Sequence, residues 1–355
     1  MIALADTASA KTPPRRLGHR RHARPAPSVT RRTTLTFDST GLARVGLIPR
    51  HGRAITEFAD LGRRGGATAR VGHRTLGPAE LVAVVTDCLI TEVMNDQRAV
   101  GAEVTLTHPA GYGADELTEL RGALDAIGLN HVALVAEPVA AAAWLEAVHG
   151  PLRPGLALVY DLGGASLDVA LVRVGAGNPH DPIVGVPLRS AEFGARAFGA
   201  LVAARGGGSS AVGALDGSAA DALRAEHVRA SLELVYRCLR RADLTMADVD
   251  YVLAVGGAAR PSEVSGVLAE ALARPVYIAP DPERTIADGA ALVARQTAAS
   301  AEETAAGAPR RGKGLLRARR KLIRVTSAAS ACGVVLAFAL PADGAVAGSA
   351  PFGLF

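Results

Sequence analysis

Two aspartates flank a pair of glycines in the segment Asp161–Asp168, which reads DLGGASLD. Apolar runs on both sides, Leu156–Tyr160 and Leu167–Val172, predict strands, so the glycines occupy the turn between them. Glycine adopts backbone angles closed to other residues, and successive N–H groups in such a turn can bind an anion. The pattern therefore predicts either a plain hairpin or a turn that binds phosphate.

Each polar group of this segment has a candidate role. Gly163 and Gly164 would offer backbone N–H groups, and Ser166 a hydroxyl donor, to a phosphate. Asp161 comes at the end of its strand, where a carboxylate can hold a metal-bound water. The GxxxxGK[ST] phosphate loop does not occur in the sequence. The residues thus predict a phosphate and magnesium site of a different kind.

Two further segments place polar or flexible residues directly after a predicted strand. Glu137-Pro138 follows Val132–Ala136 and begins a helix, so the carboxylate either orients water or a metal or simply complements the helix dipole. Gly256-Gly257 follows Val252–Val255, and glycines there allow close backbone approach to a ring or a phosphate. Arg260 beyond them can stack on an adenine or can be a solvated residue at a helix entry.

Alternating strand and helix patterns, from about residue 33 to residue 297, predict a mixed α/β sheet covered by helices. The predicted strands are Thr33–Phe37, Ala43–Ile48, Val104–Thr107, Val132–Val135, Leu156–Tyr160, Leu167–Val172, Val252–Val255 and Val276–Ile278. The predicted helices are Ala79–Met94, Ala114–Ile127, Pro138–Val148, Ala219–Arg241, Ser262–Leu272 and Thr285–Arg295. These elements would position the candidate residues at strand ends and helix starts.

The charge of the chain is distributed unevenly. The formal net charge of the 355 residues is +5, but residues 1–32 carry +7 and residues 301–355 carry +5, which leaves −7 between them. An acidic middle argues against a nucleic-acid-binding face across the core. The three cysteines, which are far apart and form no CxxC pair, argue against a disulfide framework or a zinc site: Cys88, Cys238 and Cys332.

In order and spacing, the segments resemble the DnaK-type heat-shock chaperone family of the actin-like ATPase superfamily. The resemblance covers roughly residues 33–297 and is specific in combination. Five segments carry the resemblance. AEPVAAA (Ala136–Ala142) is similar to the family's NEPTAAA, DLGGASLD (Asp161–Asp168) to DLGGGTFD, and VGGAARP (Val255–Pro261) to VGGSTRIP, with one residue fewer. DPERTIADGAA (Asp281–Ala291) is similar to NPDEAVAYGAA, and VTLTHP (Val104–Pro109) to the strand before VPAYF. The His-Pro variant is similar to membrane-attached actinobacterial members.

The resemblance implies an actin-like ATPase (ribonuclease H-like) two-lobed fold that binds ATP or ADP with Mg²⁺ in an interlobe cleft. It implies that water attacks the γ-phosphate in line. The residues implied to contact the β/γ-phosphates and magnesium are Asp161, Gly163, Gly164 and Ser166. Glu137 and Asp168 are implied to act through metal-bound water, and Gly256, Gly257 and Arg260 to hold the adenosine.

Three departures from the family pattern predict weak or lost hydrolysis. The family's DxGTT loop has no match near the start, where Leu4–Ala8 contains no glycine. The family's catalytic lysine cannot be present, because no lysine occurs between Lys11 and Lys313. The third departure is that the lobe that clamps the ribose is reduced to a glycine-rich loop around residues 205–218. Separately, the stretch after residue 300 is short for the family's peptide-binding β-domain.

The C-terminal part predicts attachment to a membrane. Eight Lys or Arg residues precede Val325–Leu340, which carries no charge. As a helix it would be about 24 Å long, short of a bilayer core of about 30 Å, so it is a membrane-spanning segment, an interfacial segment or a disordered tail. The organisation predicted is a disordered basic arm at 1–32, the ATPase-type core at 33–299, a basic linker at 300–324, this segment at 325–340 and a tail at 341–355, with a cytoplasmic core anchored at the plasma membrane.

Three functions stay open from the sequence. The first is a membrane-attached ATPase-like protein of the chaperone family that binds nucleotide and acts as a switch or scaffold. The second is a competent ATPase whose true start lies upstream and supplies the missing loop. The third is an interaction module that has lost nucleotide.

Overall fold

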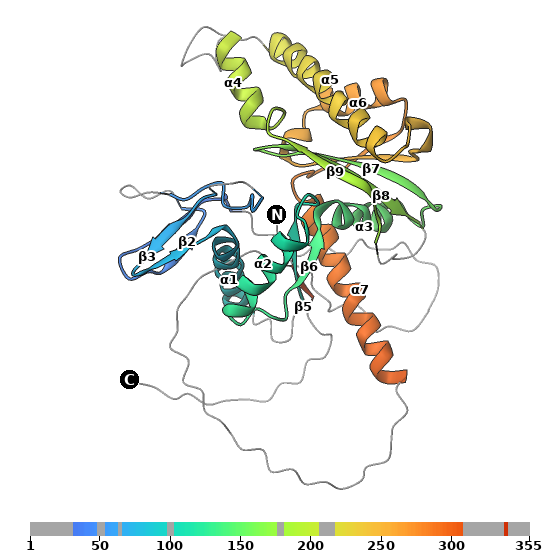
Figure 1. Ribbon diagram of the computed structural model, residues 1–355. Coiled ribbons are helices and arrows are strands. Elements are labelled where there is room, and N and C mark those ends of the chain that lie inside the picture. The colour runs from blue at the N-terminus through green and yellow to red at the C-terminus, as the bar shows by residue number, and fades with distance from the viewer. Residues whose placement is uncertain are drawn as a thin grey trace, which may run out of the picture.

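The computed structural model describes residues 31–47, 54–62, 66–97, 103–175, 181–205, 217–307 and 337–339. They form two lobes with mixed α/β structure, which confirms the predicted fold class (Figure 1). The elements of the first lobe are β1 (Leu35–Phe37), β2 (Ala43–Val45), β3 (Ala69–Val71), β4 (Arg74–Leu76), α1 (Pro78–Gln97), β5 (Glu103–His108), α2 (Ala114–Ala126) and β6 (Ala133–Ala136). Those of the second lobe are α3 (Glu137–His149), β7 (Gly155–Leu162), β8 (Leu167–Val174), β9 (Ile183–Ser190), α4 (Ala195–Arg205), α5 (Gly217–Arg241), β10 (Tyr251–Val255), α6 (Ser262–Leu272), β11 (Val276–Ile278) and α7 (Thr285–Gly307).

A five-stranded sheet with the order β11-β10-β7-β8-β9 forms the centre of the second lobe. Strand β10 runs parallel to β7, and their register aligns Val255 with Asp161. Because parallel neighbours end at the same edge of a sheet, the two glycine-bearing segments follow these strands side by side. Ligands of open α/β sheets bind outside the carboxyl ends of strands, so this edge is where a site is expected.

Strand β7 shows why its sequence is an almost continuous apolar run. Leu158 and Tyr160 belong to the core under α5 and α6, whereas Ala157 and Val159 belong to the core under α3 and α7. Side chains alternate between the two faces of a strand, and both faces are covered by helices here (Figure 1). The strand is therefore fixed in register by apolar burial on both sides.

Helices α3 and α7 approach each other closely through small residues. A Cβ placed on Gly289 would lie 1.8 Å from the carbonyl oxygen of Ala140, and Ala140 is fully buried. Helix α7 also contacts β5 of the first lobe. This helix pair thus connects the two lobes and fixes the start of α3, where Glu137 lies.

The structure contains elements that the sequence patterns did not predict: the hairpin β3–β4, strand β9 and helix α4. Strand β9 contains Gly185, with a φ of 68°, and Pro187. Both residues weaken a strand pattern, but they are tolerated here because β9 is an edge strand. Helix α7 continues to Gly307, so it includes the first eight residues of the predicted linker, 300–307. Alanine and glutamate, which dominate that stretch, are strong helix formers.

Much of the predicted C-terminal organisation lies outside the described residues, as do residues 1–30. Of the predicted segment 325–340, the structure describes Ala337–Ala339, which form strand β12 and pair antiparallel with β5 rather than forming a helix. Within the described ranges, no helix is both long enough and apolar enough to cross a membrane.

Candidate functional site

A cavity of about 230 Å³ lies between the lobes at the carboxyl end of β7. It brings together the three predicted catalytic carboxylates, Glu137, Asp161 and Asp168. The remaining lining residues come from both lobes: Asp60, Gly62, Pro109, Ala110, Gly111, Tyr112, Pro138, Val159, Val169, Ala170, Pro187, Leu188, Arg189 and Ile286. The structure thus brings these three candidate residues together, and their catalytic roles stay predictions.

Burial and neighbouring carboxylates raise the pKa of two aspartates of the cavity, Asp161 and Asp168. Burial, Glu137 and Asp168 together raise the pKa of Asp161 well above its ordinary value. Burial raises the pKa of Asp168 to about 6, against the opposing charge of Arg189. A raised pKa means that the folded protein disfavours the charged form, so the cluster is held at a cost in stability. Such clusters in a cleft are typical of functional sites.

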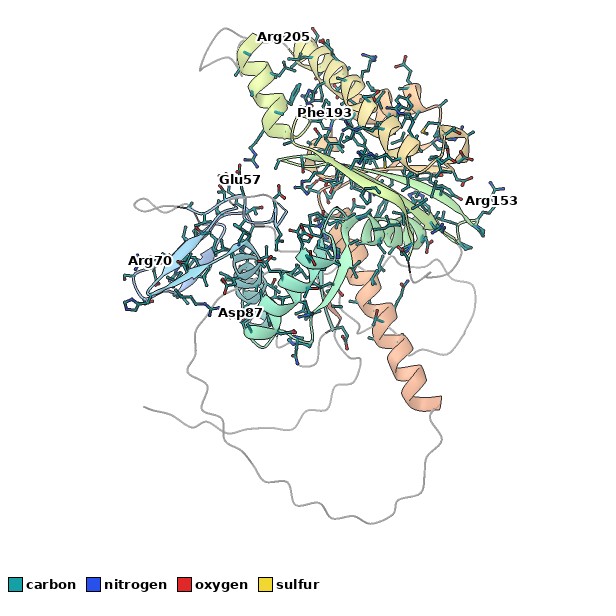
Figure 2. The ribbon with its side chains drawn as sticks, viewed as in Figure 1. Glu57, Arg70, Asp87, Arg153, Phe193 and Arg205 are labelled. Carbon is teal, nitrogen blue, oxygen red and sulfur yellow. The ribbon has the colours of Figure 1, made fainter. Side chains whose placement is uncertain are left out.

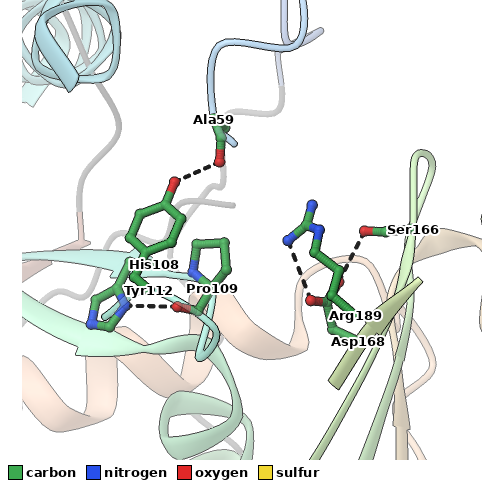
Figure 3. A network of polar contacts seen from close by, with 7 residues as sticks. All are labelled: Ala59, His108, Pro109, Tyr112, Ser166, Asp168 and Arg189. Atoms are coloured by element: carbon green, nitrogen blue, oxygen red, sulfur yellow. Dashed lines mark hydrogen bonds and ion pairs between the residues drawn. The ribbon is translucent and has the colours of Figure 1, made fainter. Parts of the chain in front are cut away.

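Asp168 is the best-connected carboxylate of the three (Figure 3). The Ser166 hydroxyl donates to one of its oxygens at 2.9 Å, and the Arg189 guanidinium donates to the other at 3.2 Å. Strand β9 delivers Arg189 opposite Asp168 in the β8–β9 ladder. Arg189 was missed because β9 was not predicted.

The first glycine turn forms hydrogen bonds within the protein. Gly163 N–H donates to the Ser166 carbonyl at 2.9 Å, and the Gly163 and Gly164 carbonyls accept from the first N–H groups of α4, those of Ala195 and Arg196, at 3.0 Å. None of Gly163, Gly164 and Ser166 lines the cavity. The turn therefore holds the start of α4, and a phosphate-binding role for these three residues stays a prediction.

The second glycine turn packs directly against the first. Gly256 has a φ of 89°, and a Cβ there would lie 2.4 Å from the Leu162 carbonyl oxygen and 2.5 Å from Asp161 Oδ1. Glycine is therefore required at this position for both conformation and space. Gly257, next to it, begins a short 3₁₀ turn, Gly257–Ala259.

Arg260 lies beyond this turn and does not line the cavity. Its guanidinium donates to Asp281, at 3.3 Å, and to Glu283. These two carboxylates hold the arginine at the surface, where its side chain is about half exposed. Stacking on an adenine, as predicted, would have to compete with this double ion pair.

Two further residues from the first lobe line the cavity without having been predicted. Asp60 adds a fourth carboxylate, and Tyr112 donates its hydroxyl to the Ala59 carbonyl at 2.5 Å (Figure 3). The Tyr112 ring stacks on His108, with ring centroids 5.8 Å apart. No periodicity marks Asp60 in the sequence, so only the fold reveals it.

Oxygen-rich clusters of this kind suit Mg²⁺. Among the described residues, however, no group of three acidic, histidine or cysteine side chains is arranged to bind one metal ion directly. The predicted role of Asp161 in holding magnesium therefore stays a prediction.

Replacing Asp168 with asparagine should stabilise the fold above pH 6. The folded pKa of about 6 lies above the ordinary value of 3.8, so stability conferred by the protonated acid is present below pH 3.8 and lost as the pH rises through about 6. Each unit of difference between the two pKa values corresponds to about 1.4 kcal/mol, so the free energy of unfolding of the asparagine variant should be about 2–3 kcal/mol higher at pH 7.5. Urea unfolding of the wild type and of Asp168→Asn from pH 3.5 to 8 measures this difference in stability. A gain that persists unchanged at pH 3.5 would contradict the assignment of the titration to Asp168.

Comparison with known proteins places this arrangement in a family. The family model described as Hsp70 protein matches residues 60–180 and 202–304. The chain is 27% identical over 256 residues to the chaperone protein HscA homolog of Pseudomonas fluorescens strain SBW25, covering 61% of this chain and 41% of that protein. It is 28% identical over 255 residues to the chaperone protein HscA of Edwardsiella ictaluri, with coverage of 61% and 41%. It is 28% identical over 287 residues to the HscA homolog of Bordetella petrii, with coverage of 68% and 44%. The chain spans less than half the length of these relatives.

Proposed function

This chain belongs to the Hsp70 protein family, and from that premise we propose that it binds ATP or ADP with Mg²⁺ at the cavity between its lobes and hydrolyses ATP weakly or not at all. One observation carries the proposal: Gly256 lies against Asp161, so that two glycine turns far apart in the sequence meet beside a cluster of three carboxylates. A plain hairpin and a plain helix entry would not require this convergence.

The residues that face the cavity fit a magnesium-bound phosphate better than a bare phosphate. Four of them are acidic, and the one arginine among the lining residues, Arg189, is paired with Asp168. Carboxylates repel phosphate oxygens, and a bound Mg²⁺ would supply the positive charge that lets the two approach. In this proposal Asp161 orients the waters of that ion, while Glu137 and Asp168 orient water near the phosphate.

The size of the cavity limits what it holds. Pockets for drug-sized ligands measure about 300–1,000 Å³. The cavity, at about 230 Å³, is smaller, so it accommodates the phosphate end of a nucleotide rather than the whole molecule. The adenosine would lie toward the turn at Gly256-Gly257, outside the cavity.

Weak hydrolysis follows from the charges. Phosphoryl transfer depends on cations placed where negative charge develops, and one missing donor of this kind costs about 3–4 kcal/mol. The sequence has no lysine between Lys11 and Lys313, and Arg189 already neutralises Asp168. Asp60, on the first-lobe side, adds negative charge instead. We therefore expect single-turnover hydrolysis on the order of 10⁻⁴ s⁻¹ or slower, the scale of phosphoryl transfer without a catalytic arginine.

Calorimetric titration of the full chain with ATP tests the proposal. Heat is expected in the presence of Mg²⁺, with a dissociation constant below about 1 mM, which corresponds to about −4 kcal/mol. The same titration in EDTA should give much weaker binding, because the carboxylates then face the phosphates without a cation. No heat at millimolar Mg-ATP would overturn nucleotide binding.

That outcome would favour the second candidate, an interaction module of this family that works without nucleotide. Specific observations support it: Arg260 is held by Asp281 and Glu283, and the Gly163 N–H and Ser166 hydroxyl are bonded within the protein. Placement of such a module at a membrane through residues 325–340 is a proposal from the sequence alone.

A further inference from the structure

The segment Ala54–Gly62, which we call the strap, borders the cavity on the first-lobe side. Its residues Asp60 and Gly62 line the cavity, and Glu57 faces the second lobe (Figure 2). The strap is neither helix nor strand, apart from an isolated bridge at Ile55. Regular backbone hydrogen bonding therefore does little to fix the strap, and its position is determined by its contacts with the two lobes.

Buried and backbone contacts attach the strap to the first lobe. Phe58 is 2% exposed and belongs to the core of that lobe. Leu35 and Ile55 exchange two backbone hydrogen bonds, of 2.9 and 2.8 Å. The Tyr112 hydroxyl donates to the Ala59 carbonyl (Figure 3). Breaking these contacts would expose a large apolar side chain and unpaired backbone groups.

An exposed ion pair joins the strap to the second lobe. Glu57 Oε1 lies 2.5 Å from a guanidinium nitrogen of Arg196, in the first turn of α4. The side chains are 42% and 62% exposed, respectively. Glu57 adopts a φ of 61°, which is unfavourable for a residue with a Cβ. A solvent-exposed pair of this kind is weak, so the strap is strongly attached to one lobe and weakly to the other.

We propose that the strap is the closing element of the cavity, and that the Glu57–Arg196 pair controls access to it. The strap moves with the first lobe, and opening separates Glu57 from Arg196. Because the Arg196 N–H donates to the Gly164 carbonyl, the closed position is also tied to the first glycine turn. The proposal concerns entry into the cavity and does not depend on which ligand enters.

Labelling of a cavity cysteine measures access without any nucleotide. Ala170 lines the cavity and is 4% exposed, so Ala170→Cys, in a background with Cys88, Cys238 and Cys332 changed to alanine, reports opening through its rate of reaction with a small methanethiosulfonate. Glu57→Gln and Arg196→Gln should each raise this rate about two- to fivefold, the range expected for loss of an exposed ion pair. The charge swap Glu57→Arg with Arg196→Glu should restore the slow rate.

Arg205→Gln is the matched control, because Arg205 forms an exposed ion pair with Glu226 within the second lobe, away from the strap (Figure 2). It should leave the labelling rate unchanged. If Ala170→Cys does not fold, Val169→Cys, at a neighbouring lining position and of similar volume, replaces it. Unchanged labelling in both single variants, or a swap that labels as fast as they do, would overturn the proposal.

Hydrogen exchange adds a second readout. The amides of Leu35 and Ile55 should stay equally protected in Arg196→Gln, because the strap remains on the first lobe when it opens. Faster exchange at these two amides would show instead that the whole strap detaches, and would overturn this mode of opening.

Discussion

Asp161→Asn is expected to lower the affinity for Mg-ATP by about tenfold to a hundredfold, while the weak affinity for ATP in EDTA stays nearly unchanged. A hydrogen bond to a charged group contributes about 1.5–3 kcal/mol, and asparagine cannot supply the charge that orients metal-bound water. Asp161 is the carboxylate whose pKa is raised by burial and by both of its acidic neighbours, Glu137 and Asp168. Calorimetry with and without Mg²⁺ measures both affinities.

Stability separates this effect from unfolding. Since the folded protein disfavours ionised Asp161, its replacement by a neutral isostere should leave the fold at least as stable at pH 7.5. Glu233→Gln, on the exposed face of α5, is the control for loss of one negative charge and should leave the affinity for Mg-ATP unchanged. If Asp161→Asn binds Mg-ATP as tightly as the wild type, the assignment of Asp161 is wrong.

Gly256→Ala is expected to reduce the free energy of unfolding by about 2–5 kcal/mol, the range of strained or overpacked substitutions. The new Cβ would meet Asp161 Oδ1 and the Leu162 carbonyl within 2.5 Å, at a φ of 89° that alanine rarely adopts. Both neighbours belong to the end of β7, so relief requires the two glycine turns to separate. Denaturant unfolding at constant m value measures the loss.

Gly266→Ala provides the matched control on α6. That glycine is exposed within a helix, and a Cβ there would meet nothing within 4 Å. Alanine in an exposed helix interior should stabilise the protein by about 0.5–1 kcal/mol. Should Gly256→Ala be as stable as the wild type, the close contact between the turns would not exist in solution.

The sequence predicted those elements whose burial leaves a clear apolar pattern, either periodic or continuous. Helix α6 has the predicted bounds, Ser262–Leu272, because its apolar residues recur at helical spacing. Strand β7 was predicted because both of its faces are buried. Strand β9 was missed because edge strands accept glycine and proline, which break the pattern.

The candidate site was predictable to the same degree. Glu137 follows strand β6 of one sheet, whereas Asp161 and Asp168 face each other at the turn between β7 and β8 of another. Each was identified because it lies next to the end of a predicted strand, and the packing of the two lobes brings them together. Asp60 was not predictable, because its approach to the cavity depends on how Phe58 and Ile55 attach the strap to the first lobe. The ion-pair partners of Arg260 were not predicted either, because Asp281 and Glu283 are 21 and 23 residues away in the sequence and approach it only in the folded chain.

Hydrogen exchange of the full chain with and without Mg-ATP tests most directly whether both turns serve one ligand. The amides of Asp161–Asp168 and of Val255–Arg260 should become protected together, with the same dependence on nucleotide concentration, and the protection should disappear in EDTA. Protection of one segment without the other, or of neither at saturating millimolar Mg-ATP, would contradict a shared nucleotide site.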